Sequence, residues 1–209
     1  MLPHKLDMPF LAGGENRKSF FHRVSRFLVP SDARFQAIER AYLLSKDAFR
    51  EVHRDGGDRY FEHNRRVTLI GMEYLHVRDF EIIIAALCHD MVEDKKEWTI
   101  ARIREEFGRR VALLMDYLSK PSPEAFPDKA ERERVYHWRL DNAPREVFLI
   151  KLPDRLDNLL GTDAWPKARR MKYVEETRRY HLPYAERHGI LVRELEYAVT
   201  LAAEYENHS

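Results

Sequence analysis

The sequence contains a single cysteine among its 209 residues and no long apolar run. Because Cys88 has no second cysteine to pair with, the chain forms neither an internal disulfide nor a site of several thiolates. The longest apolar run, residues 82–88, is far shorter than the roughly 18 residues of a membrane-spanning helix. Residues 1–30 lack the apolar stretch and small-residue cleavage site of a secretory signal. These absences predict a cytoplasmic protein with no membrane partner.

An excess of either charge is also missing. The chain has 36 Lys and Arg against 35 Asp and Glu, a formal net charge of +1. Overall basicity therefore gives no reason to expect a nucleic-acid partner, and we expect none. The 8 glycines and 10 prolines are too few for a collagen-like or low-complexity chain. The length is typical of one domain of roughly 100–200 residues.

Apolar residues recur at helical spacing along most of the chain, and no strand-like alternation persists. Asp32 and Thr99 are suited to cap the helices that follow them. We therefore expect an all-α helical bundle, with residues 31–209 as the domain and residues 1–30 as a helical N-terminal extension. Whether the extension packs in the core, covers the domain or contacts a second subunit stays open, as does the oligomeric state. The predicted helices span residues 35–49, 60–75, 80–90, 100–118, 128–141, 145–160, 167–187 and 191–206.

The segment 80–90 is apolar nearly all round and predicts a central buried helix that continues through His89 and Asp90, although its isoleucines would also suit a buried strand. On a continuing helix, Glu93 lies four residues after His89, and Asp94 four after Asp90, so these side chains are neighbours. One imidazole and three carboxyls would then converge beside a buried segment. Unpaired charges are costly there, and a divalent cation is the simplest compensation. The alternative is a solvated helix end whose acids pair with nearby lysines.

Two further residues stand out in helical segments. His63 lies on an amphipathic helix, and Asp154 is an acid within a mostly apolar one. Each alone is more often a satisfied core or surface residue than a ligand. Together with His89 and Asp90, they form the ordered pattern H…HD…D, which resembles that of the HD-domain metal-dependent phosphohydrolases.

The flanking residues make the resemblance more specific. Residues 85–94 resemble the pattern AALLHDxxED, and residues 149–158 resemble LIKLADRLHN. Both patterns belong to the hydrolase domain of the RelA/SpoT alarmone enzymes and to stand-alone small alarmone hydrolases of the metazoan SpoT homologue type. The resemblance runs from about residue 35 to residue 203, and the length suits a stand-alone hydrolase. Further matching segments are Arg54-x-x-Gly57-x-x-Tyr60-x-x-His63, residues 107–120 and residues 175–189.

The resemblance implies Mn²⁺ as the cofactor, and two imidazoles with two carboxylates would also accept another divalent transition ion. It implies that Glu93 and Asp94 are the catalytic pair, which handles the attacking water and proton transfer. The metal ligands that it implies are His63, His89, Asp90 and Asp154.

Three residues are candidates for substrate contact. The resemblance implies that Arg54 packs on the nucleotide, because a planar guanidinium stacks on a purine, and that Asn158 contacts the sugar or a phosphate. Lys120 is a candidate cation for phosphate charge. Tyr60 is either a further contact residue or a core residue, and we favour the core.

The reaction implied is hydrolysis of the 3′-pyrophosphate of guanosine alarmones (ppGpp and pppGpp) to GDP or GTP and pyrophosphate, as part of the stringent response. Asp55, Asp157 and Gly161 depart from the family pattern near the expected nucleotide site. The alternatives are therefore an HD phosphohydrolase acting on another nucleotide (an adenosine alarmone, a nucleoside phosphate or NADPH) and a catalytically silent nucleotide-sensing HD domain.

Overall fold

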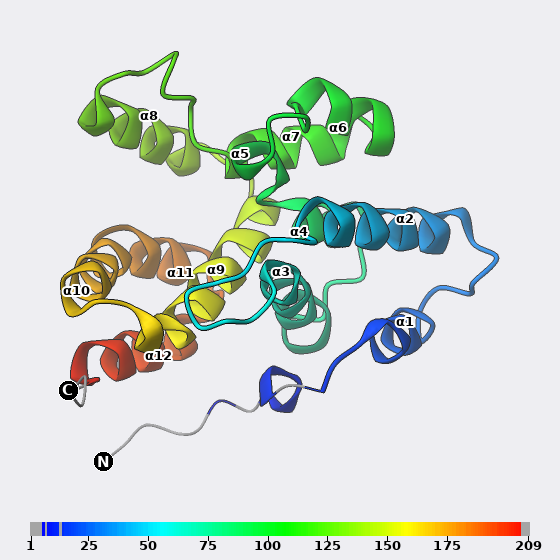
Figure 1. The fold of residues 1–209 in the computed structure, drawn as a ribbon, viewed down its shortest axis with the longest axis horizontal. Coiled ribbons are helices and arrows are strands. Elements are labelled where there is room, and N and C mark those ends of the chain that lie inside the picture. Colours follow the sequence, from blue (N-terminus) through cyan, green and yellow to red (C-terminus); the bar gives the residue numbers. More distant parts are fainter. Residues whose placement is uncertain (1–5, 7, 13, 206–209) are drawn as a thin grey trace.

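The computed structural model describes residues 6, 8–12 and 14–205 (Figure 1). These residues form no strand, apart from one isolated antiparallel bridge between His53 and Arg59, so the all-α prediction is confirmed. None of the described helices is long and apolar enough to cross a membrane. The elements are η1 (Pro9–Ala12), α1 (Arg17–Val24), α2 (Ala33–Ala48), α3 (Tyr60–Leu69), η2 (Ile70–Tyr74), α4 (Phe80–Cys88), α5 (Met91–Asp94), α6 (Ile100–Phe107), α7 (Arg109–Leu118), α8 (Lys129–Asp141), α9 (Arg145–Leu160), η3 (Thr162–Ala164), α10 (Lys167–Glu176), η4 (Thr177–His181), α11 (Leu182–His188) and α12 (Val192–Glu204).

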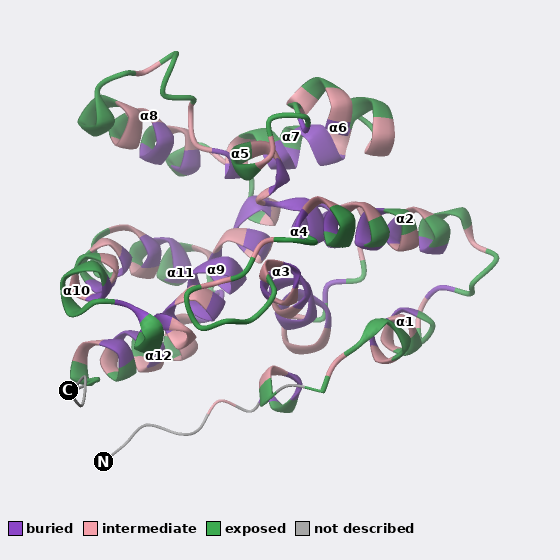
Figure 2. Ribbon diagram, viewed as in Figure 1, coloured by how far each residue is buried: buried purple, intermediate pink, exposed green. Residues whose placement is uncertain are grey.

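Helix α9 lies at the centre of the molecule. It packs against α3, α4 and α7 and against α11 and α12 (Figure 1). Its side chains Ile150, Leu152 and Leu156 are fully buried, and Figure 2 shows buried residues gathered along α9 and α3. A helix enclosed by several others buries even its polar side chains, and Asp154, Arg155 and Asp157 are all buried. Arg145, at the first position of α9, is exposed, so it is the polar groups beyond the first turn that lie close to the core.

Side-chain caps begin several of these helices. Asp32 accepts a hydrogen bond from the Arg34 backbone N–H at 2.8 Å, and Thr99 accepts one from Arg102 at 3.2 Å. Each bond satisfies a backbone donor that the first turn of a helix leaves unpaired. Both predicted caps are confirmed.

The segment 80–90 is helical, as predicted, but the helix ends two residues before the predicted end. Helix α4 stops at Cys88, and His89 and Asp90 form a turn before α5. The His89 ring atom Nδ1 lies 2.8 Å from the Ala86 carbonyl oxygen, which the Asp90 N–H would use in a continued helix. Such side-chain bonds to the backbone compete with helical pairing.

The predicted single helix 100–118 is wrong, because it divides at Gly108 into α6 and α7. Gly108 has φ 91° and ψ 174°, a backbone conformation that is essentially restricted to glycine. The apolar spacing of Phe107 and Val111 carries on across this break, so the sequence pattern did not reveal it. Gly108 thus turns the chain between the two helices.

A Gly108→Ala variant is expected to lower the free energy of unfolding by about 1–3 kcal/mol, the usual cost of a strained backbone conformation. A Cβ at this position meets no atom within 4 Å, so the loss would come from backbone strain alone. Urea denaturation measures it. Gly71→Ala is the matched control, since its Cβ would make ordinary contacts at 3.8 and 3.9 Å and its φ is not positive. Equal losses in the two variants would contradict this account.

The N-terminal helix α1 contributes to the main core. Phe20 and Val24 are fully buried, and the Phe20 ring lies 5.1 Å from the ring of Tyr42 on α2. Of the phenylalanines of the extension, Phe10 and Phe20 therefore lie in the core, and Phe21 and Phe27 are half-buried against it. The domain boundary at residue 30 stays a prediction. Residues 1–5, 7 and 13 of the extension and residues 206–209 of the predicted domain lie outside the described residues, as does the end of the predicted last helix.

Candidate metal centre and its two pockets

Four polar side chains from distant segments meet beside α9. His63 on α3 and the pair His89–Asp90 after α4 bring ligand atoms within 4.8 Å of one another. Asp154 on α9 reaches the same place, with Oδ1 3.3 Å from His63 Nε2 and 3.7 Å from His89 Nε2. The four meet because α3 and α4 both pack on α9.

The donor atoms of this cluster fit a divalent cation. Both histidines turn Nε2 toward the carboxylates, since Nδ1 of His63 contacts Asp157 at 2.7 Å and Nδ1 of His89 contacts Ala86. His89 Nε2 is buried and makes no hydrogen bond within the described part of the chain, although Asp90 Oδ2 lies 3.1 Å away. Imidazole nitrogens with carboxylate oxygens suit Mn²⁺, Fe²⁺, Co²⁺ or Zn²⁺. The residues present therefore form a possible His/Asp metal site.

Neighbouring charges set the protonation of the cluster. Burial would lower the pKa of His63 and His89, but the carboxylates around them raise it overall. Burial would raise the pKa of Asp154, yet Lys151 and the two histidines hold it well below its usual range. The Lys151 ammonium lies 3.0 Å from Asp154 Oδ2. Asp154 is therefore ionised, the form in which a carboxylate binds a metal.

Glu93 and Asp94 follow the cluster on the short helix α5. The Glu93 side chain is exposed overall, but nearby protein atoms desolvate its carboxyl group and raise its pKa. Desolvation, together with the charge of Asp90, also raises the pKa of Asp94. A carboxyl group whose pKa moves toward neutrality is suited to proton transfer. Glu93 shares a pocket with Asp90 and Asp154, whereas Asp94 lines neither of the two pockets described below.

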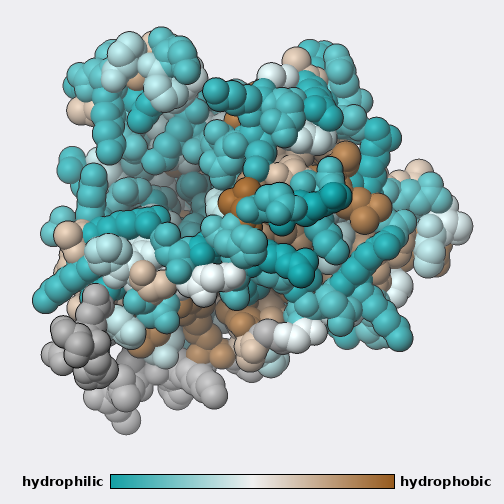
Figure 3. Space-filling model, viewed as in Figure 1, coloured by the Kyte–Doolittle hydropathy of each residue, from teal (hydrophilic) through white to brown (hydrophobic). Residues whose placement is uncertain are grey.

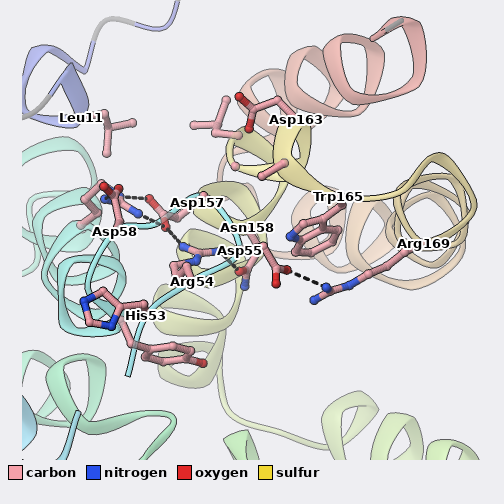
Figure 4. A pocket seen from close by; sticks show the side chains of 16 residues that line it. Leu11, His53, Arg54, Asp55, Asp58, Asp157, Asn158, Asp163, Trp165 and Arg169 are labelled. Carbon is pink, nitrogen blue, oxygen red and sulfur yellow. Dashed lines mark hydrogen bonds and ion pairs between the residues drawn. The ribbon is translucent and has the colours of Figure 1, made fainter. Parts of the chain in front are cut away.

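The first cavity, which we call the Arg54 pocket, has a volume of about 550 Å³, within the usual range for small-molecule sites. Arg54 donates to Asp157 Oδ2 at 2.8 Å and to Asn158 Oδ1 at 2.5 Å (Figure 4). Arg169 Nη1 forms an ion pair with Asp55 Oδ2 at 2.7 Å, and the Arg169 guanidinium lies 4.0 Å from the Trp165 ring centroid. The residues that line this pocket are Leu11, His53, Arg54, Asp55, Gly56, Asp58, Tyr60, Arg66, Asp157, Asn158, Leu160, Gly161, Asp163, Ala164, Trp165 and Arg169.

The second cavity, the Lys151 pocket, has a volume of about 580 Å³ and is lined by residues of α8, α9 and α10. The hydrophilic face in Figure 3 is hollowed between α8 and α10. Lys120 lines this pocket, but its ammonium is already paired with Glu133 at 3.1 Å. Tyr60 and Asn158 line both cavities, and they contact Asp90 and Asp154, the two cluster residues that line the Lys151 pocket.

Tyr60 was predicted to be a core residue, and this prediction is only half right. Its ring stacks on buried Phe49 with centroids 4.7 Å apart, while its hydroxyl donates to Asp90 Oδ2 at 3.0 Å. The signal was present in the sequence, because Tyr60 lies three residues before His63 and therefore on the same helix face. Asp157 lies likewise three residues after Asp154, and its contact with His63 was not predicted.

An all-α bundle with two histidines and two aspartates converging at one point is the architecture of an HD domain. Residues 41–191 match the HD domain family, and the chain belongs to that family. The predicted HD helical bundle is thereby confirmed.

The comparisons also confirm the resemblance to RelA/SpoT hydrolases. The chain is 36% identical over 160 residues to a guanosine-3′,5′-bis(diphosphate) 3′-pyrophosphohydrolase of Aquifex aeolicus, covering 74% of this chain and 22% of that protein. It is 32% identical over 165 residues to the bifunctional (p)ppGpp synthase/hydrolase SpoT of Escherichia coli, covering 78% of this chain and 23% of that protein. The chain thus spans about a fifth of the length of these curated relatives.

A solved structure shares the fold. It belongs to a metazoan ortholog of SpoT, which is described as hydrolysing ppGpp, and aligns with a TM-score of 0.70 at 22% identity. The alignment covers 81% of this chain and 95% of that chain. This likeness supports the arrangement of helices described above.

Proposed function

We propose that this chain is a metal-dependent phosphohydrolase that removes the 3′-pyrophosphate of ppGpp or pppGpp, giving GDP or GTP and pyrophosphate. The main observation behind this proposal is the convergence of His63, His89, Asp90 and Asp154 beside the Lys151 pocket, which Asp90 and Asp154 line. The activities named for the bacterial relatives support this choice of substrate. The proposal includes a cytoplasmic role in the stringent response.

The proposed metal ligands are those four residues, and the proposed ion is Mn²⁺. When bound, it would supply charge stabilisation and water activation. Glu93, at the rim of the same pocket, accepts the proton of the attacking water. Asn158 donates to Asp154 Oδ1 at 2.6 Å and thereby fixes that carboxylate.

We assign the nucleoside to the Arg54 pocket. The arginines there are paired with acids, Arg54 with Asp157 and Arg169 with Asp55, so the pocket carries little net charge. The planar guanidinium of Arg54 and the ring of Trp165 are suited to stacking on a purine. We assign the phosphate groups to the Lys151 pocket. Its lining contains six acids and six cations, and three of these cations, Lys129, Lys172 and Arg179, form no ion pair within the described residues.

A different nucleotide is the second candidate substrate. Three of the departures from the family pattern, Asp55, Asp157 and Gly161, line the Arg54 pocket, whereas Asn64, which stands where the family has proline, does not. Because these three substitutions lie where the nucleoside would bind and leave the catalytic residues in place, they favour a different base preference over a loss of turnover. A silent sensor is less well supported, because Glu93 and Asp94 are both present.

With Mn²⁺ added, the purified chain is expected to release pyrophosphate from the 3′ position of ppGpp, and Asp90→Ala is expected to abolish this release because it removes a metal ligand. Ion-exchange chromatography of the products measures both results.

The same assay should be run with other substrates, namely pppGpp, an adenosine alarmone, nucleoside monophosphates and NADPH, each with Mn²⁺, Mg²⁺ or Zn²⁺. Asp116→Asn, which alters a surface ion pair with Arg139, is the control. Turnover of nucleoside monophosphates alone would contradict the proposal, and full metal occupancy without turnover would indicate a sensor.

A further inference from the structure

Asp157 is buried, with only 4% of the residue exposed. Its carboxylate contacts three side chains. Its Oδ2 lies 2.7 Å from His63 Nδ1 and accepts from Arg54 Nη1 at 2.8 Å. Arg66 on α3 donates to Oδ1 through Nε at 2.6 Å and to Oδ2 through Nη2 at 3.2 Å. Two arginines and a histidine therefore hold one buried acid in place, and bidentate pairing with Arg66 also fixes its plane.

This contact orients a residue of the metal cluster. A carboxylate flanked by two guanidinium groups accepts hydrogen bonds, so the proton of the neutral His63 ring lies on Nδ1. The lone pair of Nε2 then points to the other side of the ring, where Asp154 Oδ1 lies at 3.3 Å and Asp90 Oδ2 at 3.6 Å. Carboxylates that accept from the second nitrogen of a ligating histidine commonly fix its tautomer and orientation.

The same carboxylate also anchors the Arg54 pocket. Arg54 donates through one nitrogen to Asp157 and through the other to Asn158, so its guanidinium plane is set by two residues of α9. Only 14% of the Arg54 side chain is exposed, which leaves it few alternative orientations. A stacking residue held in this way loses little conformational entropy when a ligand binds.

We propose that Asp157 is a positioning residue that aligns His63 toward the cation and Arg54 toward the nucleotide through one shared carboxylate. This inference rests on the proposed function and deepens it, because it makes metal binding and nucleotide binding depend on a common support.

The test compares Asp157→Asn with a matched control, Glu73→Gln. Glu73 is also a largely buried carboxylate held by two arginines, Arg23 at 2.8 Å and Arg26 at 3.2 Å, and it lines neither pocket. Isothermal titration of Mn²⁺ into chelator-treated protein is expected to show about 10–100-fold weaker binding for Asp157→Asn, the usual loss when a supporting partner of a ligand is changed. The control is expected to bind Mn²⁺ like the unchanged protein.

Two further measurements separate positioning from general stability. Long-range ¹H–¹⁵N correlation spectra of the chelator-treated protein, recorded at a pH above the raised pKa of His63 so that its ring is neutral, are expected to show His63 protonated on Nδ1. Asp157→Asn is expected to lose this preference. The KM for ppGpp is expected to rise in Asp157→Asn even at saturating Mn²⁺, because Arg54 has lost its anchor. Asp157→Glu, which keeps the charge, is expected to recover part of the Mn²⁺ affinity and provides a second variant if Asp157→Asn does not fold.

The outcomes distinguish this inference from the proposed function. Wild-type affinity and an unchanged His63 tautomer in Asp157→Asn, with Mn²⁺ binding and ppGpp turnover intact, would overturn the positioning role and leave the proposed function standing. Equal losses in Asp157→Asn and Glu73→Gln would also overturn it, since they would indicate a structural ion pair only. Absence of Mn²⁺ binding in the unchanged protein would overturn both.

Discussion

A Glu93→Gln variant is expected to lower kcat about 10²–10⁴-fold, the usual contribution of a positioned acid–base group. The Glu93 carboxyl group lines the pocket that contains Asp90 and Asp154, and its raised pKa suits proton transfer. An amide cannot accept the proton. It can still accept the backbone N–H of Lys120, which Glu93 Oε1 now does at 2.9 Å, so the local fold should survive.

Single-turnover kinetics with ppGpp measure this loss, and titration of Mn²⁺ shows whether the metal site is intact. Mn²⁺ affinity should be nearly unchanged, because Glu93 is not among the proposed ligands. Glu105→Gln, on the exposed face of α6, controls for removal of one acid. A kcat close to that of the unchanged chain would assign proton transfer to another group, with Asp94 the first to examine.

An Asp154→Ala variant is expected to lose more than about 100-fold in Mn²⁺ affinity, since changing even the supporting partners of ligands costs about 10–100-fold. Stability should fall as well. Asp154 lies 3.0 Å from the ammonium of Lys151, whose side chain is 14% exposed. Breaking a buried ion pair from one side typically costs about 3–5 kcal/mol, because the remaining charge is left without its partner.

Calorimetric titration and urea denaturation measure the two effects separately. The double variant Asp154→Ala, Lys151→Met removes the uncompensated charge as well. It should recover part of the stability and none of the Mn²⁺ affinity. If Asp154→Ala alone binds Mn²⁺ normally, Asp154 is not a ligand, and the cluster reduces to His63, His89 and Asp90.

The sequence predicts much of this molecule because its strongest patterns are local. Helical spacing of apolar residues predicts the helix type throughout, and the bounds of α9 agree with the predicted segment 145–160. Asp154 stands out as an acid in a largely apolar helix, and His89 and Asp90 stand out as polar residues directly after an apolar one. His63, on an amphipathic helix, stands out only through the ordered pattern H…HD…D. Their convergence follows once α3 and α4 pack on α9.

Other features depend on contacts that no local pattern contains. Gly108 interrupts a helix whose apolar spacing continues past it, and a single glycine costs a helix only about 1 kcal/mol, too little to predict a break. The turn at His89 depends on a ring-to-carbonyl hydrogen bond. Asp157 could have faced any neighbour along its side of α9, and only the position of α3 brings His63 and Arg66 to it.

Residues of helix α9 line both pockets. Asp154, Asp157 and Asn158 project from the same face of α9, at relative positions i, i+3 and i+4, and the opposite faces of α9 are enclosed by other helices. A helix whose backbone groups are all hydrogen-bonded moves as one rigid unit, and a close-packed interior transmits strain from one part of it to another. The cation site and the Arg54 pocket are therefore mechanically linked, and a cavity opened beneath α9, far from any reacting atom, would misalign both of them together.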